Sequence, residues 1–115
     1  MPTIRITTTD SPDGALRDDL LRQAARIVAE APNKAVEKCM VALVADCPMR
    51  FGDDTPAAFV EVKSIGEMPP EVTTAIARGL SDLLAQALGI APRRTYIEFT
   101  EATRRLWGHN GAPME

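Results

Sequence analysis

Pro2 is the residue of this chain with the most direct capacity for chemistry. It follows Met1, and aminopeptidases readily remove a methionine that precedes a small residue such as proline. We therefore expect a mature chain that begins with the secondary amine of Pro2. An α-amino group ordinarily titrates near ~7.7–8.0, and burial or neighbouring cations would lower that pKa. Such an amine would be a neutral general base near physiological pH. The alternative is a proline that merely begins a strand.

Cysteine and histidine, two other residue types that often do chemistry, form no recognised pattern here. We expect Cys39 in a buried strand and Cys47 in the turn after it, and this spacing predicts neither a disulfide framework nor a Cys-x-x-Cys metal site. The single histidine, His109, cannot complete a zinc site with distant cysteines on any recognised spacing. We therefore expect no metal and no cofactor.

Composition limits the class of protein and its partners. The 115 residues suffice for a single domain, 1–115, with a real core. A net charge of −3 gives no positive field for nucleic acid or an anionic membrane, so we expect neither partner. No apolar run approaches the roughly 20 residues of a transmembrane helix, and no basic-then-apolar signal segment opens the chain. We expect a cytoplasmic protein.

The first half of the chain has the pattern of a strand, a helix and a strand. Thr3–Thr8 alternates apolar and polar residues, as a strand does. An apolar stripe at helical spacing then predicts an amphipathic helix, which Ala31-Pro32 ends. Met40–Ala45 is almost wholly apolar, which predicts a central strand covered on both faces. The stripe consists of Leu16, Leu20, Ala24, Ile27, Val28 and Ala31.

The second half repeats this order. Ala58–Lys63 alternates as a strand, and Pro69-Pro70 fits the first turn of a second helix that Gly89 ends. Thr95–Phe99 is the fourth expected strand, and Arg104–Glu115 is expected to be irregular. The buried stripe of the second helix consists of Val72, Ile76, Leu80, Leu83, Leu84, Ala87 and Leu88.

The repeat predicts an α+β fold of two β-α-β units. Ala31-Pro32 and Ala91-Pro92, which lie 60 residues apart, mark corresponding points of the two units. Right-handed crossovers would put both helices on one face of a four-stranded mixed sheet. The other face would be bare, with either Ala42 and Val44 or their neighbours exposed on it. A bare apolar face predicts self-association.

This layout, together with four stretches of sequence, resembles the tautomerase superfamily. The stretches are Pro2, Asn33-Lys34, the residues from Phe59 to Gly66, and the Trp-Gly-x-Asn-Gly segment within 105–111. Within the superfamily the chain is similar to the macrophage migration inhibitory factor family, and more to its bacterial members than to its animal ones. The resemblance implies a homotrimer with active sites between subunits. It also implies cofactor-free keto–enol tautomerisation of phenylpyruvate-like α-keto acids.

The resemblance also implies roles for single residues. Pro2 would be the general base, and the Lys34 cation would bind a carboxylate or enolate oxygen and lower the Pro2 pKa. Ile65 would donate its backbone N–H to substrate from a turn shaped by Ser64. Without the resemblance, Lys34 would be a solvated residue at a helix end and Ile65 part of a plain turn.

The remaining implied positions include departures from the family pattern. Tyr96 would line the pocket of the neighbouring subunit and Trp107 would form a wall of it, although both residue types also pack in interfaces. Lys38 stands where relatives have an aromatic residue, and Glu98 where animal members have Asn. His109 and Met114 replace a Trp and a Phe. These changes predict a smaller, more polar α-keto or enol substrate and poor phenylpyruvate activity.

Two alternatives remain open. A superfamily dehalogenase, decarboxylase or hydratase would use the same proline with paired arginines, for which Arg93 and Arg94 are candidates unless they are simply solvated on the surface. The second alternative is a trimer that retains the fold and has lost its chemistry, which the missing aromatic positions would support.

Overall fold

The first half of the chain folds as a strand, a helix and a parallel strand, as predicted. The computed structural model describes residues 2–114. Strand β1 spans Thr3–Thr8, helix α1 Gly14–Glu30, the short 3-10 helix η1 Val36–Lys38, and strand β2 Met40–Val44. The second half has the same order, with β3 at Ala58–Ile65, α2 at Pro70–Leu88, η2 at Pro92–Arg94 and β4 at Thr95–Ala102.

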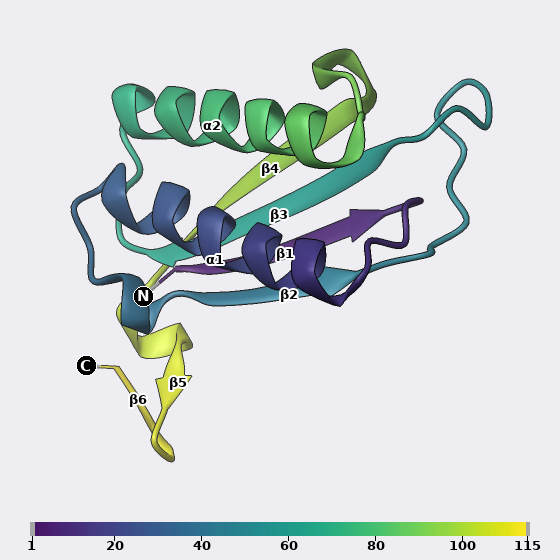
Figure 1. Cartoon of the computed structure of the whole chain (residues 1–115). Helices are drawn as coiled ribbons and strands as arrows, with labels where there is room; N and C mark the ends of the chain where they lie inside the picture. The colour runs from purple at the N-terminus through teal and green to yellow at the C-terminus, as the bar shows by residue number, and fades with distance from the viewer. Residues whose placement is uncertain (1, 115) are drawn as a thin grey trace.

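The two β-α-β units join through their first strands. The strand order is β2-β1-β3-β4. Strands β1 and β2 are parallel, β3 and β4 are parallel, and β1 and β3 pair antiparallel at the centre. Both helices cover the same face of this four-stranded mixed sheet (Figure 1). The predicted fold class is confirmed.

Local signals set the helix boundaries. The Asp13 side chain accepts a hydrogen bond of 2.9 Å from the Leu16 N–H and so caps the start of α1. Pro70 stands in the first turn of α2, where its missing N–H leaves no bond unmade. Gly89 ends α2 with a left-handed φ of 69°, a conformation that glycine adopts without a steric penalty.

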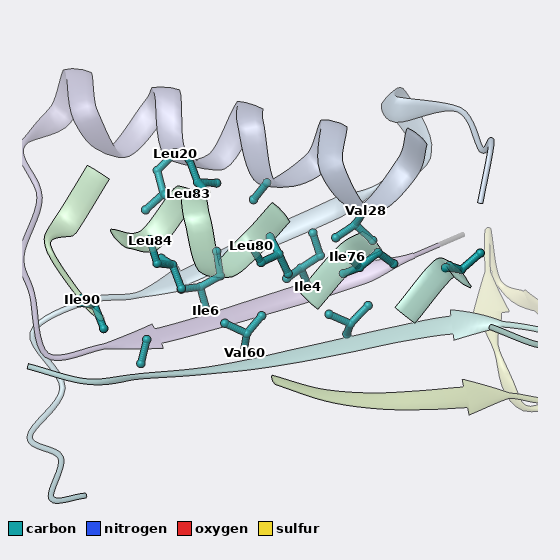
Figure 2. Packing of buried hydrophobic residues seen from close by; sticks show 14 residues of the cluster. Ile4, Ile6, Leu20, Val28, Val60, Ile76, Leu80, Leu83, Leu84 and Ile90 are labelled. Carbon is teal, nitrogen blue, oxygen red and sulfur yellow. The ribbon is translucent and has the colours of Figure 1, made fainter. Parts of the chain in front are cut away.

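The core lies between the helices and one face of the sheet. Figure 2 shows its main side chains, which come from β1, β3 and the facing stripes of both helices. The helices approach closely at Gly79, where an added Cβ would lie 2.9 Å from Ile27 Cγ2. The labelled core residues are Ile4, Ile6, Leu20, Val28, Val60, Ile76, Leu80, Leu83, Leu84 and Ile90.

Strand β2 lies at the edge of the sheet, so the prediction of a central strand covered on both faces is wrong. Val41 and Leu43 pack against the core, whereas Met40, Ala42 and Val44 are exposed on the bare face. A continuous apolar run predicts that both faces avoid water, but a run of residues does not say what covers the second face. Cys39, expected inside this strand, instead lies directly before it and is half-buried.

The tail is not irregular, as the sequence interpretation had it. After the 3-10 helix η3, Arg104–Leu106, a small hairpin pairs β5, Gly108–His109, with β6, Ala112–Pro113. Its turn is Asn110-Gly111, with φ of 52° and 83°, and Asn-Gly favours the two-residue hairpin turn. The hairpin projects past the end of the sheet where β1 begins (Figure 1).

Over residues 2–114, none of the helices combines the length and the apolar composition required to cross a membrane.

Candidate functional site

A pocket of about 870 Å³ lies at the end of the sheet where β1 begins. Three segments that are distant in sequence form it: the start of β1, the passage from η1 into β2, and the C-terminal hairpin. Its lining residues are Pro2, Thr3, Glu37, Lys38, Cys39, Met40, Trp107, Gly108, His109 and Met114.

Pro2 is held at the inner wall of this pocket by the sheet. Its carbonyl accepts a hydrogen bond of 3.1 Å from the Met40 N–H, and its ring is fully buried. Thr3 pairs with Met40 on one side and with Lys63 on the other. Pro2 therefore lies level with Ser64, one position further along β3.

Lys34, Ser64 and Ile65 come together beside this end of β1. The Lys34 ammonium donates to the Ser64 hydroxyl at 2.9 Å and to the Ile65 carbonyl at 3.2 Å. Asn33, with a left-handed φ of 58°, turns the chain after α1, and the Lys34 N–H bonds back to the Ala29 carbonyl at 2.7 Å. A residue at a helix end thus reaches across to the end of β3. Lys34 does not line the pocket wall itself.

Lys38 and Trp107 line the pocket, together with His109 and Met114 at the positions that depart from the family pattern. The hairpin that carries the last three is closed by a hydrogen bond of 2.9 Å from the Met114 N–H to the Trp107 carbonyl. Among the described lining residues, Trp107 is the only aromatic residue other than the imidazole of His109. Most of the wall is apolar, and Glu37 and Lys38 add one charge of each sign to it.

Four lining positions were missed by the sequence interpretation: Thr3, Glu37, Cys39 and Met40. Thr3 adjoins Pro2, Glu37 and Cys39 adjoin Lys38, and Met40 lies two positions after Lys38. This proximity in sequence was the available signal. Glu37 puts a carboxylate next to the Lys38 cation on the same wall. Burial raises the pKa of the Cys39 thiol, so this side chain is a neutral thiol at physiological pH.

Tyr96 and Glu98 do not join Pro2 within one chain. Tyr96 pairs with Phe59, five positions along β3 from Ser64, which corresponds to roughly 17 Å at the usual rise per residue. Glu98 pairs with Glu61 on β3. Both side chains are exposed on the bare face of the sheet, whereas the Ser64 side chain is buried on the helix-covered face.

A second cluster, formed by Phe51 and Arg94, lies on one side of Tyr96. Its ring contacts the ring of Phe51 at a centroid distance of 4.6 Å, and the Arg94 guanidinium lies 5.0 Å from the Phe51 centroid. Arg94 is only 7% exposed, so the expectation that it is solvated on the surface is wrong. Its donors are taken by the loop at 51–56, because that loop folds back over the start of β4. Arg93 is exposed, and neither arginine lines the Pro2 pocket.

Among residues 2–114, no group of three or more His, Cys, Asp or Glu side chains is arranged to hold a metal ion.

Comparison with known proteins agrees with the fold and with the whole length of the chain. The model of the family described as macrophage migration inhibitory factor (MIF) matches residues 1–115. A macrophage migration inhibitory factor homolog from Brugia malayi is 32% identical over 113 residues, which are 97% of each chain. The structure of a homologue from Prochlorococcus marinus is 33% identical with a TM-score of 0.90, covering 98% of this chain and 99% of that one.

A more distant structure shares the fold alone. Pt0534, solved after inactivation by 2-oxo-3-pentynoate, is 16% identical with a TM-score of 0.85 over 97% of this chain and 94% of its own. The full-length family match, the two relatives above 30% identity and the pair of β-α-β units lead to one conclusion: this chain belongs to the macrophage migration inhibitory factor family.

Proposed function

We propose that the protein is a cofactor-independent keto–enol tautomerase of α-keto acids, with the N-terminal amine of Pro2 as general base. The observation that carries this proposal is the position of Pro2 at the wall of a pocket, beside the Lys34 cluster. Family membership supports it, because this is the activity and the base that the sequence resemblance implied.

The proposed reaction moves one proton. After removal of Met1, the neutral amine takes a proton from the carbon next to the keto group. The electron pair moves onto the carbonyl oxygen as an enolate, and the proton returns to that oxygen to give the enol. The reverse sequence restores the keto acid. A buried ring favours the neutral form of the amine, which is the form that acts as a base.

Lys34 is the proposed partner of the developing negative charge. An ammonium group has three donors, and the two protein acceptors, Ser64 and Ile65, leave one for a substrate oxygen. Those two bonds also orient the side chain in advance, which lets its charge act without reorganisation during the reaction. We further propose that the Ile65 N–H donates to substrate and that Ser64 fixes the turn.

We propose a homotrimer in which Tyr96 and Glu98 complete the pocket of a neighbouring subunit. Both residues are exposed and far from Pro2 in their own chain. The bare sheet face also exposes the apolar side chains of Met40, Val44 and Phe59. Covering such a face with a second copy removes apolar surface from water.

Two charges on the pocket wall support a substrate with a second polar group. Lys38 and Glu37 contribute these charges to a lining that is otherwise mostly apolar, and among the described lining residues Trp107 alone offers a broad apolar ring. We therefore propose that phenylpyruvate is turned over but is bound poorly, and that small α-keto acids with a second polar group are preferred.

An alkynyl keto acid tests the base directly. In 2-oxo-3-pentynoate the alkyne is conjugated to the keto group. A neutral amine adds to the far alkyne carbon, the N–C bond forms, and the amine proton ends on the neighbouring carbon. We expect one full reagent mass per chain, located on the peptide that begins with Pro2, and loss of phenylpyruvate enol-to-keto conversion in parallel with labelling.

Two controls make this result specific. A chain that retains an extra residue before Pro2 should be neither labelled nor active, and Cys39→Ala should be labelled as fully as the parent chain. A protein whose intact mass retains Met1 and which is nevertheless fully active would contradict the proposal. So would a label carried by the Cys39 thiol.

A further inference from the structure

Arg94 is bound to the loop at 51–56 by several hydrogen bonds and one ion pair. Its guanidinium donates to the carbonyls of Phe51, Thr55 at 2.6 Å and Pro56 at 3.4 Å, and it forms an ion pair of 3.2 Å with Asp53. A planar guanidinium presents five N–H donors in a fixed geometry, so these acceptors are held at fixed positions relative to one another.

The loop is also ordered by its own short-range bonds. The backbones of Phe51 and Asp53 form an isolated antiparallel β-bridge. The Asp53 carboxylate accepts a hydrogen bond of 3.0 Å from the Thr55 N–H. The loop and Arg94 therefore hold each other, and the Phe51 ring lies beneath the guanidinium as a result.

Phe51 is in turn the aromatic neighbour of Tyr96. The two rings are tilted at 49° with centroids 4.6 Å apart, within the range of favourable aromatic pairs. The Tyr96 side chain is otherwise exposed, at 63% for the residue. Arg94 and Tyr96 stand two positions apart, but the guanidinium is buried while the phenol is presented to whatever covers the bare face.

We propose that Arg94 is a positioning residue for Tyr96. By fixing the loop, it holds Phe51 against one side of the Tyr96 ring and so sets the direction in which this ring reaches a substrate in the neighbouring subunit. The positioning itself is a property of this chain, whereas its use in substrate binding rests on the proposed function.

Kinetics test the use in binding. Arg94→Met should raise KM for the accepted α-keto acid about three- to tenfold and change kcat less than about twofold, because a misplaced ring loses binding and leaves the Pro2 base intact. Arg94→Lys keeps the charge near Asp53 without the fork and should show the same KM rise. Arg93→Met, at the exposed neighbour, should match the parent protein.

A double-mutant cycle identifies the route of the effect. If Arg94 acts through Tyr96, adding Arg94→Met to Tyr96→Leu should leave KM unchanged from Tyr96→Leu alone. The same KM rise in both backgrounds would overturn the role in binding, because the effect would then bypass the tyrosine.

A spectroscopic measurement tests the positioning without any assay. The chain has one tyrosine, so 3-fluorotyrosine gives a single fluorine signal from Tyr96. We expect Arg94→Met to shift or broaden this signal and Arg93→Met to leave it in place. Phe51→Leu, which removes the ring contact and keeps Arg94, should move it as well and serves if Arg94→Met does not fold.

The two parts of the inference can fail separately from the proposed function. An unmoved fluorine signal in folded Arg94→Met would overturn the positioning by Arg94, and an unmoved signal in Phe51→Leu would overturn its route through the Phe51 ring. A parent protein inactive on every α-keto acid tried would overturn the proposed function and the role in binding with it, while the fluorine signal would still decide whether Arg94 positions Tyr96.

Discussion

The two ends of the central sheet differ in whether the candidate functional residue is buried or exposed. Where β1 begins, the proposed base is buried: the Pro2 ring lies in a pocket wall and the Lys34 ammonium is held by two acceptors. Where β4 begins, the buried group is Arg94, and Tyr96 is exposed in front of it. One end thus contains a pocket with the proposed base, and the other presents an exposed ring beside a buried guanidinium.

Under the proposed function, neither end suffices alone. Burial of an amine base favours its neutral form, which is the form that accepts a proton. A ring that is to contact a ligand in another subunit must instead remain accessible and have its direction set by its own chain. Because roughly 17 Å separate the two ends along the sheet, the proposed site, which uses both Pro2 and Tyr96, requires a second copy of the chain.

The largest expected effect comes from mixing two defective chains. A chain with a retained residue before Pro2 lacks the base and should lose at least ~10²-fold in turnover, and Tyr96→Leu should bind poorly. Co-expressed with different tags and purified by both, they should form mixed trimers with some sites that combine an intact Pro2 and an intact Tyr96. We expect kcat/KM well above that of either parent. Activity equal to the sum of the parents would contradict a shared site.

Removing the Lys34 charge should affect catalysis more than stability. Lys34→Ala removes the proposed donor to the enolate, for which, by analogy with other oxyanion donors, we expect a loss of about 2–4 kcal/mol in the transition state. The same change removes two hydrogen bonds within the fold, for which we expect about 1–2 kcal/mol in the free energy of unfolding. Steady-state kinetics and urea unfolding measure the two quantities on one preparation.

Arg26→Ala, at an exposed position of α1, is the matched control for loss of one positive charge. It should change neither the steady-state kinetics nor the free energy of unfolding. Parental kinetics in Lys34→Ala on every accepted substrate would exclude Lys34 from the site.

Placing aromatic residues at two positions of the pocket wall should improve catalysis with phenyl substrates. The double variant His109→Trp and Met114→Phe should raise kcat/KM for phenylpyruvate about tenfold, since each apolar pocket contact contributes roughly 1–3 kcal/mol and part of it is lost to imperfect fit. Kinetics with phenylpyruvate and with a small polar keto acid give the ratio of the two kcat/KM values. The same ratio in the parent protein and in the double variant would show that these residues do not set selectivity.

The smallest expected effect is the response of the Tyr96 end to acid. Hydrogen bonds from Thr55, and secondarily the Arg94 charge, lower the pKa of the Asp53 carboxyl. Its contribution to the hold on the loop is therefore complete above the ordinary Asp pKa of ~3.9 and is lost as the pH falls through the lowered value. The fluorine signal of Tyr96 should shift only below that ordinary pKa, while Trp107 fluorescence at the other end serves as the internal reference.

Asp53→Asn removes the titrating group and should abolish this acid-dependent shift. An identical shift in the variant would assign it to another carboxyl group. The effect is expected to be small because the Asp53 side chain is exposed.

Periodicity predicted most of the fold, because it depends only on neighbouring residues. The alternation over Ala58–Lys63 assigned each side chain to its face correctly, and both helical stripes pack as expected. The tail was misjudged although Asn110-Gly111 was a local hairpin signal. The edge position of β2 had no local signal, since an apolar run is the same whether a helix or another chain covers its second face.

For the site, the sequence by itself predicted a mature start at Pro2 and a cation at Lys34, and it showed the replacement of aromatic residues by Lys38, His109 and Met114. Only the tertiary structure placed Pro2, Lys38 and the hairpin around one pocket and Tyr96 at the far end of the sheet. It alone also showed that Arg94 is buried by a loop 38 to 43 residues earlier in the chain. The physical reason is that residue type and spacing specify which groups a strand or turn offers, whereas burial depends on which distant segment folds back over them.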